Sequence, residues 1–134
     1  EEPQLLIDMA PLTGAARVAL GPDLPPFYTD DEALAADIAA ASGEEEDPLW
    51  RMPLWQPYAA RLSSRIADMN NVTSDSFAGS ITAALFLKRF VEKAKSWAHF
   101  DIFAWNPAER PHGPVGGEAQ GIRALEKVIS RRFG

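Results

Sequence analysis

The segment from Leu5 to Leu20 (LLIDMAPLTGAARVAL) constrains the fold of this chain more than any other stretch. Its three consecutive apolar residues, Leu5 to Ile7, are typical of a strand that is buried on both faces of a sheet. Thr13 is a suitable N-cap for a short helix over Gly14–Leu20, and the Gly21-Pro22 pair predicts the end of that helix. The segment therefore predicts a strand over residues 4–10, a tight turn and a helix of small residues.

Longer segments with helical or strand periodicity follow along the chain. Apolar residues three and four apart predict a helix over residues 31–42. The strongest helical pattern covers residues 77–94, and its apolar central part predicts a helix covered on most sides. Residues 97–105 alternate as a strand does. A final helix is expected over 118–133, and the apolar face predicted for it consists of Ile122, Leu125, Ile129 and Phe133.

Shorter segments complete the pattern. Residues 43–48 are acidic, and we favour a solvated loop over a cation site because calcium loops space their ligands and include a glycine among them. Residues 48–55 are aromatic and bounded by prolines, which predicts an extended, buried segment. A short helix is expected over 56–63, a short strand over 66–71 and a surface loop over 107–117. Alternating strands and helices predict one α/β domain over residues 1–134.

The composition excludes several classes of function. The net charge is −6 and the basic residues are scattered, which argues against a nucleic-acid partner. No apolar run approaches the roughly 20 residues that a membrane helix needs, so no membrane partner is expected. The absence of cysteine excludes disulfides, thiol catalysis and thiolate zinc sites. It also fits a reducing, cytoplasmic location.

His99 and Asp101 lie two residues apart, on one face of the expected strand. A histidine beside a carboxylate is what an acid–base site needs. No matching nucleophile accompanies the pair, however, and the neighbouring aromatic residues indicate packing. We favour a core histidine with a hydrogen-bonded ring nitrogen, and the acid–base site remains the alternative.

Other candidate sites are weaker. Thr13-Gly14 opens a helix whose N–H groups could bind an anion, and Gly14 would allow a substrate to approach closely, although an ordinary strand-to-helix turn is favoured. His112 lies in a Pro/Gly loop without neighbouring ligands, and Gly113–Gly117 is interpreted as a surface loop. Three or four converging ligands, as a metal site requires, are not evident, so no metal-binding or catalytic residue is assigned.

Five blocks in order give the chain a family resemblance. The chain resembles the leucyl (cytosol) aminopeptidase family over nearly its whole length. The blocks are LLIDMAPLTGAARVAL at 5–20, WRMPL at 50–54, IADMNN at 66–71, AGSITAALFL at 78–87 and WAHFDI at 97–102. The resemblance implies the C-terminal portion of a zinc-exopeptidase-like catalytic domain, with a mixed β-sheet flanked by helices, in a protein that assembles as a hexamer.

The resemblance also implies a chemistry. Members of the family release N-terminal residues from peptides with two divalent metal ions, zinc or manganese, which activate a bridging water and polarise the scissile carbonyl. The family's metal ligands come from a lysine-and-aspartate segment and an Asn-Thr-Asp-Ala-Glu-Gly-Arg motif. Both segments precede the Leu-Thr-Gly strand in the family, and neither occurs in this sequence.

The resemblance implies a set of substrate-binding residues in this chain. They are Leu12, Thr13 and Gly14 at the turn, with Phe103 and Asn106 in the pocket for the first side chain. Asn106 makes that pocket more polar than one that prefers leucine. Pro11 stands where the family usually has threonine, and it removes a hydroxyl and an N–H beside the cleft.

Two functional interpretations follow. In the first, the chain is a segment of a metallo-aminopeptidase acting on peptides, inactive until the ligand segment is supplied. In the second, it is a non-catalytic remnant or degenerate member that acts as an assembly or binding module. A truncated domain would expose an apolar face where the lost strands packed, so we expect self-association, or a structure rearranged to cover that face.

Overall fold

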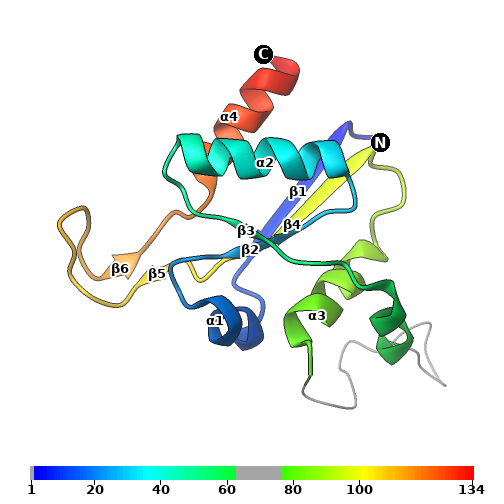
Figure 1. Cartoon of the computed structure of the whole chain (residues 1–134), viewed down its shortest axis with the longest axis horizontal. Coiled ribbons are helices and arrows are strands. Elements are labelled where there is room, and N and C mark those ends of the chain that lie inside the picture. Colours follow the sequence, from blue (N-terminus) through cyan, green and yellow to red (C-terminus); the bar gives the residue numbers. More distant parts are fainter. Residues whose placement is uncertain (1, 63–76) are drawn as a thin grey trace.

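In the part of the chain that the structure describes, a four-stranded mixed sheet lies between two pairs of helices (Figure 1). The computed structural model describes residues 2–62 and 77–134. Strand order is β1-β4-β2-β3, in which β1 is parallel to β4, β4 is antiparallel to β2, and β2 is parallel to β3. The strands are β1 (Leu5–Ala10), β2 (Pro26–Tyr28), β3 (Trp50–Arg51) and β4 (Ser96–Asp101). The predicted mixed α/β architecture is confirmed.

Strand β1 and helix α1 (Gly14–Leu20) confirm the elements predicted from the first sixteen-residue block. The predicted burial of β1 on both faces is wrong, because β1 lies at an edge of the described sheet and Leu6 is 38% exposed. Thr13 is the N-cap of α1 and its side chain accepts the N–H of Ala16 at 3.1 Å. Gly21 ends the helix with φ 78°, a conformation that glycine adopts without steric cost. The sequence therefore fixes both ends of this short helix.

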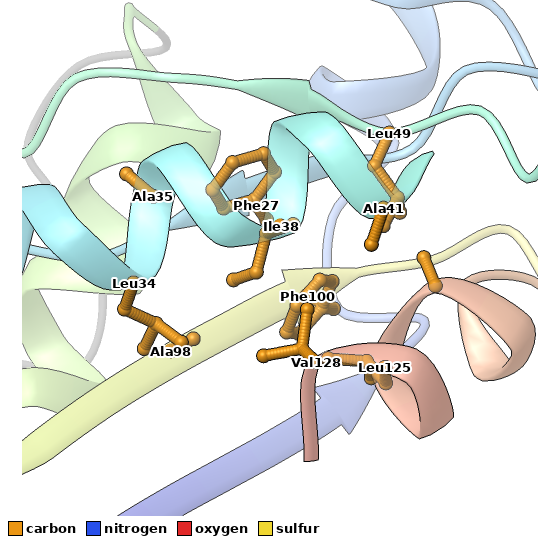
Figure 2. Close-up of a cluster of buried hydrophobic side chains, with 11 residues drawn as sticks. Phe27, Leu34, Ala35, Ile38, Ala41, Leu49, Ala98, Phe100, Leu125 and Val128 are labelled. Atoms are coloured by element: carbon orange, nitrogen blue, oxygen red, sulfur yellow. The ribbon is translucent and has the colours of Figure 1, made fainter. Parts of the chain in front are cut away.

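One face of the sheet packs on helices α2 (Glu32–Glu44) and α4 (Ile122–Phe133) (Figure 2). Phe27 of β2 and Phe100 of β4 stack with their ring centroids 5.8 Å apart, beneath Ile38 of α2. The whole cluster comprises Phe27, Leu34, Ala35, Ile38, Ala41, Leu49, Ala98, Phe100, Ala124, Leu125 and Val128. This layer is the main hydrophobic core of the described residues.

The opposite face of the sheet is covered by α1 and α3 (Gly79–Lys88). Gly79 lets these helices approach closely, since a Cβ atom placed there would lie 3.3 Å from that of Ala15. Because helices cover both faces, residues 97–101 of β4 are all buried. The predicted helix at 77–94 is correct in its centre, but it ends at Lys88, where hydrogen bonds to carbonyls three residues back tighten the last turn.

The final helix has a different buried face from the one predicted. Helix α4 begins at Ile122, and its buried residues are Ala124, Leu125 and Val128. Ile122, Ile129 and Phe133 are 54%, 43% and 51% exposed, so three of the four predicted core positions are wrong. Leu125 packs as expected, but the helix is rotated so that the small residues Ala124 and Val128 fit against α2 and the sheet.

The aromatic segment at 48–55 is extended but not buried as predicted. Trp50 and Trp55 are 57% and 55% exposed. The physical reason is that β3 lies at the edge of the sheet, where it pairs with β2 alone among the described strands. A 3₁₀ helix over Gln56–Leu62 follows, close to the expected helix, and the strand expected at 66–71 lies outside the described residues.

Two short strands occupy the region after β4. The predicted strand at 97–105 stops at Asp101, because Gln120 Oε1 takes the N–H groups of Phe103 and Ala104 at 3.0 Å each and Ala104 has φ 57°. Strand β5 (Trp105–Asn106) then pairs antiparallel with β6 (Gly116–Gly117). The glycines predicted as surface loop therefore include a two-residue strand.

Candidate functional site

A pocket of about 210 Å³ lies where β1 and β4 end and α1 begins. The turn at Leu12, Thr13 and Gly14 forms one side of it, and Phe103 lies on another. Pro22 and Pro25, from the segment between α1 and β2, also line the pocket, together with Pro26, the first residue of β2. Since β1 and β4 are parallel, their carboxyl ends meet at this edge of the sheet, the usual place for ligand sites in α/β folds.

The turn is held by the carboxylate of Asp101, the last residue of β4. Asp101 Oδ1 accepts the backbone N–H of Leu12 at 3.0 Å and that of Thr13 at 3.1 Å. The hydroxyl of Thr13 donates to Asp101 Oδ2 at 2.6 Å while it accepts the N–H of Ala16. The same threonine thus caps α1 and ties the turn to the neighbouring strand.

A second layer of polar groups lies behind Asp101. Ser80 Oγ of α3 lies 3.4 Å from Asp101 Oδ2 and also hydrogen-bonds with the hydroxyl of Tyr28. Burial raises the pKa of Tyr28 to about 12, the Ser80 hydrogen bond lowers it in part, and the charge of Asp101 raises it. Tyr28 therefore stays protonated at neutral pH, as a buried hydroxyl without a counter-ion must.

His99 and Asp101 do not form the acid–base pair that remained an alternative interpretation. His99 is fully buried, and its Nδ1 pairs instead with Asp8, which also accepts the indole N–H of Trp97 at 2.7 Å. The rings of Tyr28 and Trp97 stack with the His99 imidazole. Its Nε2 atom has no hydrogen-bond partner within residues 2–62 and 77–134. The favoured core histidine is what the structure contains, with one ring nitrogen bonded.

Four of the five expected substrate-binding residues surround this pocket: Leu12, Thr13, Gly14 and Phe103. Asn106 does not. Its side chain is buried and donates to the carbonyls of Gly113 at 3.3 Å and Pro114 at 2.8 Å, and it lines a separate pocket beside the start of α4. In this structure Asn106 therefore holds the β5–β6 loop.

Sequence reasoning missed two features of the pocket: the side chain of Arg17 and the role of Asp101 in the turn. Arg17 lines it, and its guanidinium carbon lies 4.8 Å from the centroid of the Phe103 ring. The sequence feature that could have indicated Arg17 is its position three residues after Gly14, because residues one helical turn apart lie on the same face of α1. The role of Asp101 in the turn was missed because nothing in the sequence indicated that β4 lies parallel to β1.

The described residues do not fit a two-cation centre. They contain no group of three or more His, Cys, Asp or Glu side chains that could hold a metal ion. The two buried carboxylates already have backbone partners among the described residues, since Asp101 binds the turn and Asp47 binds the first turn of α4. The partly exposed Asp8 pairs with His99. Within the same residues, no helix has the length and apolar character needed to cross a bilayer.

Known proteins match the chain closely. Residues 1–126 match the cytosol aminopeptidase family, catalytic domain. A probable cytosol aminopeptidase of Prochlorococcus marinus (strain MIT 9215) is 42% identical over 133 residues, and one of Rickettsia bellii (strain OSU 85-389) is 41% identical over 135. Each alignment covers 98% of this chain and 27% of the relative, so the chain spans about a quarter of the length of these proteins.

Solved structures give the same result. The crystal structure of cytosol aminopeptidase from Coxiella burnetii superposes with a TM-score of 0.93 and 48% identity, over 99% of this chain and 29% of that one. The bottromycin maturation enzyme BotP in complex with Mn superposes with a TM-score of 0.86 and 35% identity, over 96% of this chain and 29% of that one. Fold, block order and family match agree, and this chain belongs to the cytosol aminopeptidase family.

Proposed function

We propose that this chain supplies the peptide-binding wall of a metal-dependent aminopeptidase that releases N-terminal residues. The observation that carries the proposal is the pocket at the carboxyl ends of β1 and β4, lined by Leu12, Thr13, Gly14 and Phe103. These positions are the ones at which the family resemblance expects the substrate. Residues 1–134 are proposed to act as one unit, the C-terminal portion of the catalytic domain.

The geometry of Gly14 supports a ligand at this pocket. Apart from its chain neighbours and the backbone of α1, a Cβ atom built on Gly14 would meet no heavy atom of the described residues within 4 Å. Packing among these residues therefore does not require glycine at this position, whereas the close approach of a peptide would. Leu12 is also 43% exposed, which leaves this part of the turn accessible.

The residues present indicate which part of the reaction this chain would perform. The turn would bind and orient the peptide backbone, while the Phe103 side would enclose the first side chain and exclude water from it. The described residues do not fit a metal pair, so no step is assigned to zinc or manganese on this chain. We propose that the polypeptide completing the catalytic domain carries the two divalent ions.

A non-catalytic role is the second candidate, and exposed apolar surface favours it. Strand β1 lies at one edge of the described sheet with Leu6 exposed, and Trp50 and Trp55 are exposed near the other edge. Such surface promotes association, so we propose that the isolated chain self-associates, in a cytoplasmic protein as the names of its relatives suggest. Light scattering that finds a compact monomer would contradict this part of the proposal.

A chimera tests the peptidase proposal. Residues 1–134 would replace the matching 29% of the Coxiella burnetii cytosol aminopeptidase, which has the same fold over that portion. The folded chimera, loaded with manganese or zinc, should release p-nitroaniline from leucine p-nitroanilide, and a chelator should abolish the release. A folded, metal-loaded chimera without activity would favour the non-catalytic candidate.

A further inference from the structure

We propose that Asp101 is a positioning residue for the peptide-binding turn. Its carboxylate would hold the backbone of Leu12 and Thr13 in the conformation that receives the peptide, without touching the peptide itself. This inference rests on the proposed function, because it assigns a task to a residue in the lining of the proposed peptide site.

The contacts of Asp101 are concentrated on the turn. One carboxylate oxygen accepts two consecutive backbone N–H groups, from Leu12 at 3.0 Å and Thr13 at 3.1 Å, and the other accepts the hydroxyl of Thr13 at 2.6 Å. Hydrogen bonds to an ionised acceptor are about twice as strong as neutral ones. Three such bonds to two adjacent residues fix both the direction and the height of the turn above the sheet.

Asp101 is itself held firmly. It is 3% exposed, it pairs with Ala10 at the end of the parallel β1–β4 ladder, and the N–H of the next residue, Ile102, donates to the Ala10 carbonyl at 3.1 Å. Ser80 approaches its second oxygen from α3. The turn after β1 therefore takes its position from β4, through a carboxylate that cannot move without disturbing the sheet.

The same contacts exclude a direct chemical role for this carboxylate. Both oxygens of Asp101 already accept hydrogen bonds from the turn, so it is not placed to serve as a general base towards a peptide. Its contribution is geometric. A displacement of about 1 Å in a positioning group can reduce the rate by about 100-fold, so the conformation of the turn matters for catalysis.

The test uses Asp101→Asn in the chimera that contains the whole 134-residue chain. The substitution preserves size and one carbonyl oxygen, but it removes the charge and one of the two acceptors. We expect the KM for leucine p-nitroanilide to rise and kcat/KM to fall by about 100-fold, because the turn no longer holds its position.

The matched control is Asp47→Asn. Asp47 is also a buried carboxylate that accepts several backbone N–H groups, but it does so at the start of α4, away from this pocket. A purely structural defect lowers the folded fraction, which reduces the apparent kcat and leaves KM unchanged. The Asp47 variant should behave in that way, and the Asp101 variant should raise KM.

Thr13 gives a rescue series on the same contact. Thr13→Ser retains the hydroxyl that donates to Asp101 and should raise KM much less than Thr13→Val does. Thr13→Val removes the hydroxyl and should raise KM as the Asp101 variant does. The inference is overturned if folded Asp101→Asn keeps KM within about two-fold of the unsubstituted value.

A second readout does not depend on activity. In amide NMR spectra of the 134-residue chain, Asp101→Asn should shift the resonances of Leu12, Thr13 and Gly14, and Asp47→Asn should leave them in place. Unmoved turn resonances in the Asp101 variant would overturn the inference. If the unsubstituted chimera is inactive but the resonances shift, the proposed function fails, while the structural link between Asp101 and the turn stands.

Discussion

Asp47 Oδ2 accepts the backbone N–H of Ala124 at 3.1 Å, which links the loop after α2 to the first turn of α4. The same carboxylate accepts the N–H groups of Gly121 and Arg123 at 2.9 Å each. Helix α4 has glycine at its N-cap and no capping side chain of its own, so Asp47 supplies the cap from a distant part of the sequence.

Replacing this cap should weaken the fold. Asp47→Ala leaves three N–H groups at the start of α4 without their acceptor, and we expect the free energy of unfolding to fall by about 2 kcal/mol. Urea denaturation measures this loss of stability, and Glu109→Ala, a substitution at an exposed residue, is the control. Equal stabilities of the two variants would show that Asp47 does not cap α4.

Two adjacent residues test the orientation of α4. Val128 is 1% exposed and Ile129 is 43% exposed, although the sequence pattern placed Ile129 in the core. Val128→Ala should cost about 1–3 kcal/mol through lost burial and an unfilled cavity, and Ile129→Ala should cost less than about 1 kcal/mol. Thermal unfolding compares the pair, and the reverse order of stability would mean that α4 is rotated relative to this structure.

Tyr28 should make stability depend on pH in the alkaline range. Burial raises its pKa from 10.0 to about 12, so the unfolded chain loses this proton at a lower pH than the folded chain does. The contribution of Tyr28 to the free energy of unfolding is therefore fully present below pH 10.0 and is lost as the pH rises towards about 12. The loss amounts to about 3 kcal/mol at most.

Absorbance measurements can follow this ionisation directly. The chain has two tyrosines, so Tyr58→Phe leaves Tyr28 as the only source of tyrosinate absorbance. The midpoint should lie near pH 12 while the chain is folded. A midpoint near pH 10.0, with the fold intact, would contradict the buried environment described for this hydroxyl.

Substitution of Gly14 should separate the stability of the fold from the proposed peptide binding. Gly14→Ala adds a methyl group at the first residue of α1, where the described residues outside the helix backbone and the chain neighbours leave space within 4 Å, so stability should stay within about 1 kcal/mol of the original or rise. In the chimera the same methyl group should obstruct the peptide and raise KM. Gly121→Ala is the contrasting variant, since φ 81° at that position predicts strain and lower stability.

The sequence predicted what is encoded locally. Consecutive apolar residues, the Thr13 cap and the Gly21 stop defined β1 and α1 without knowledge of the rest of the fold. The block order then identified the family. Local signals worked because each of these elements is specified by its own residues and by backbone hydrogen-bonding rules.

The remainder depends on contacts between distant segments. Whether Ile129 or Val128 of α4 is buried depends on how α2 and the sheet meet that helix, since both residues are apolar. Burial of Trp50 depends on whether its strand is central or at an edge. The link between Asp101 and Leu12 spans 89 residues and requires knowing that β1 and β4 are neighbours.

The most direct test of the central claim is hydrolysis of leucine p-nitroanilide by the purified 134-residue chain with added manganese or zinc. We expect no metal-dependent release of p-nitroaniline, because the described residues contain the proposed peptide-binding turn without a set of metal ligands. Release that depends on the metal and is abolished by a chelator would contradict it, since this chain would then contain a working metal centre of its own.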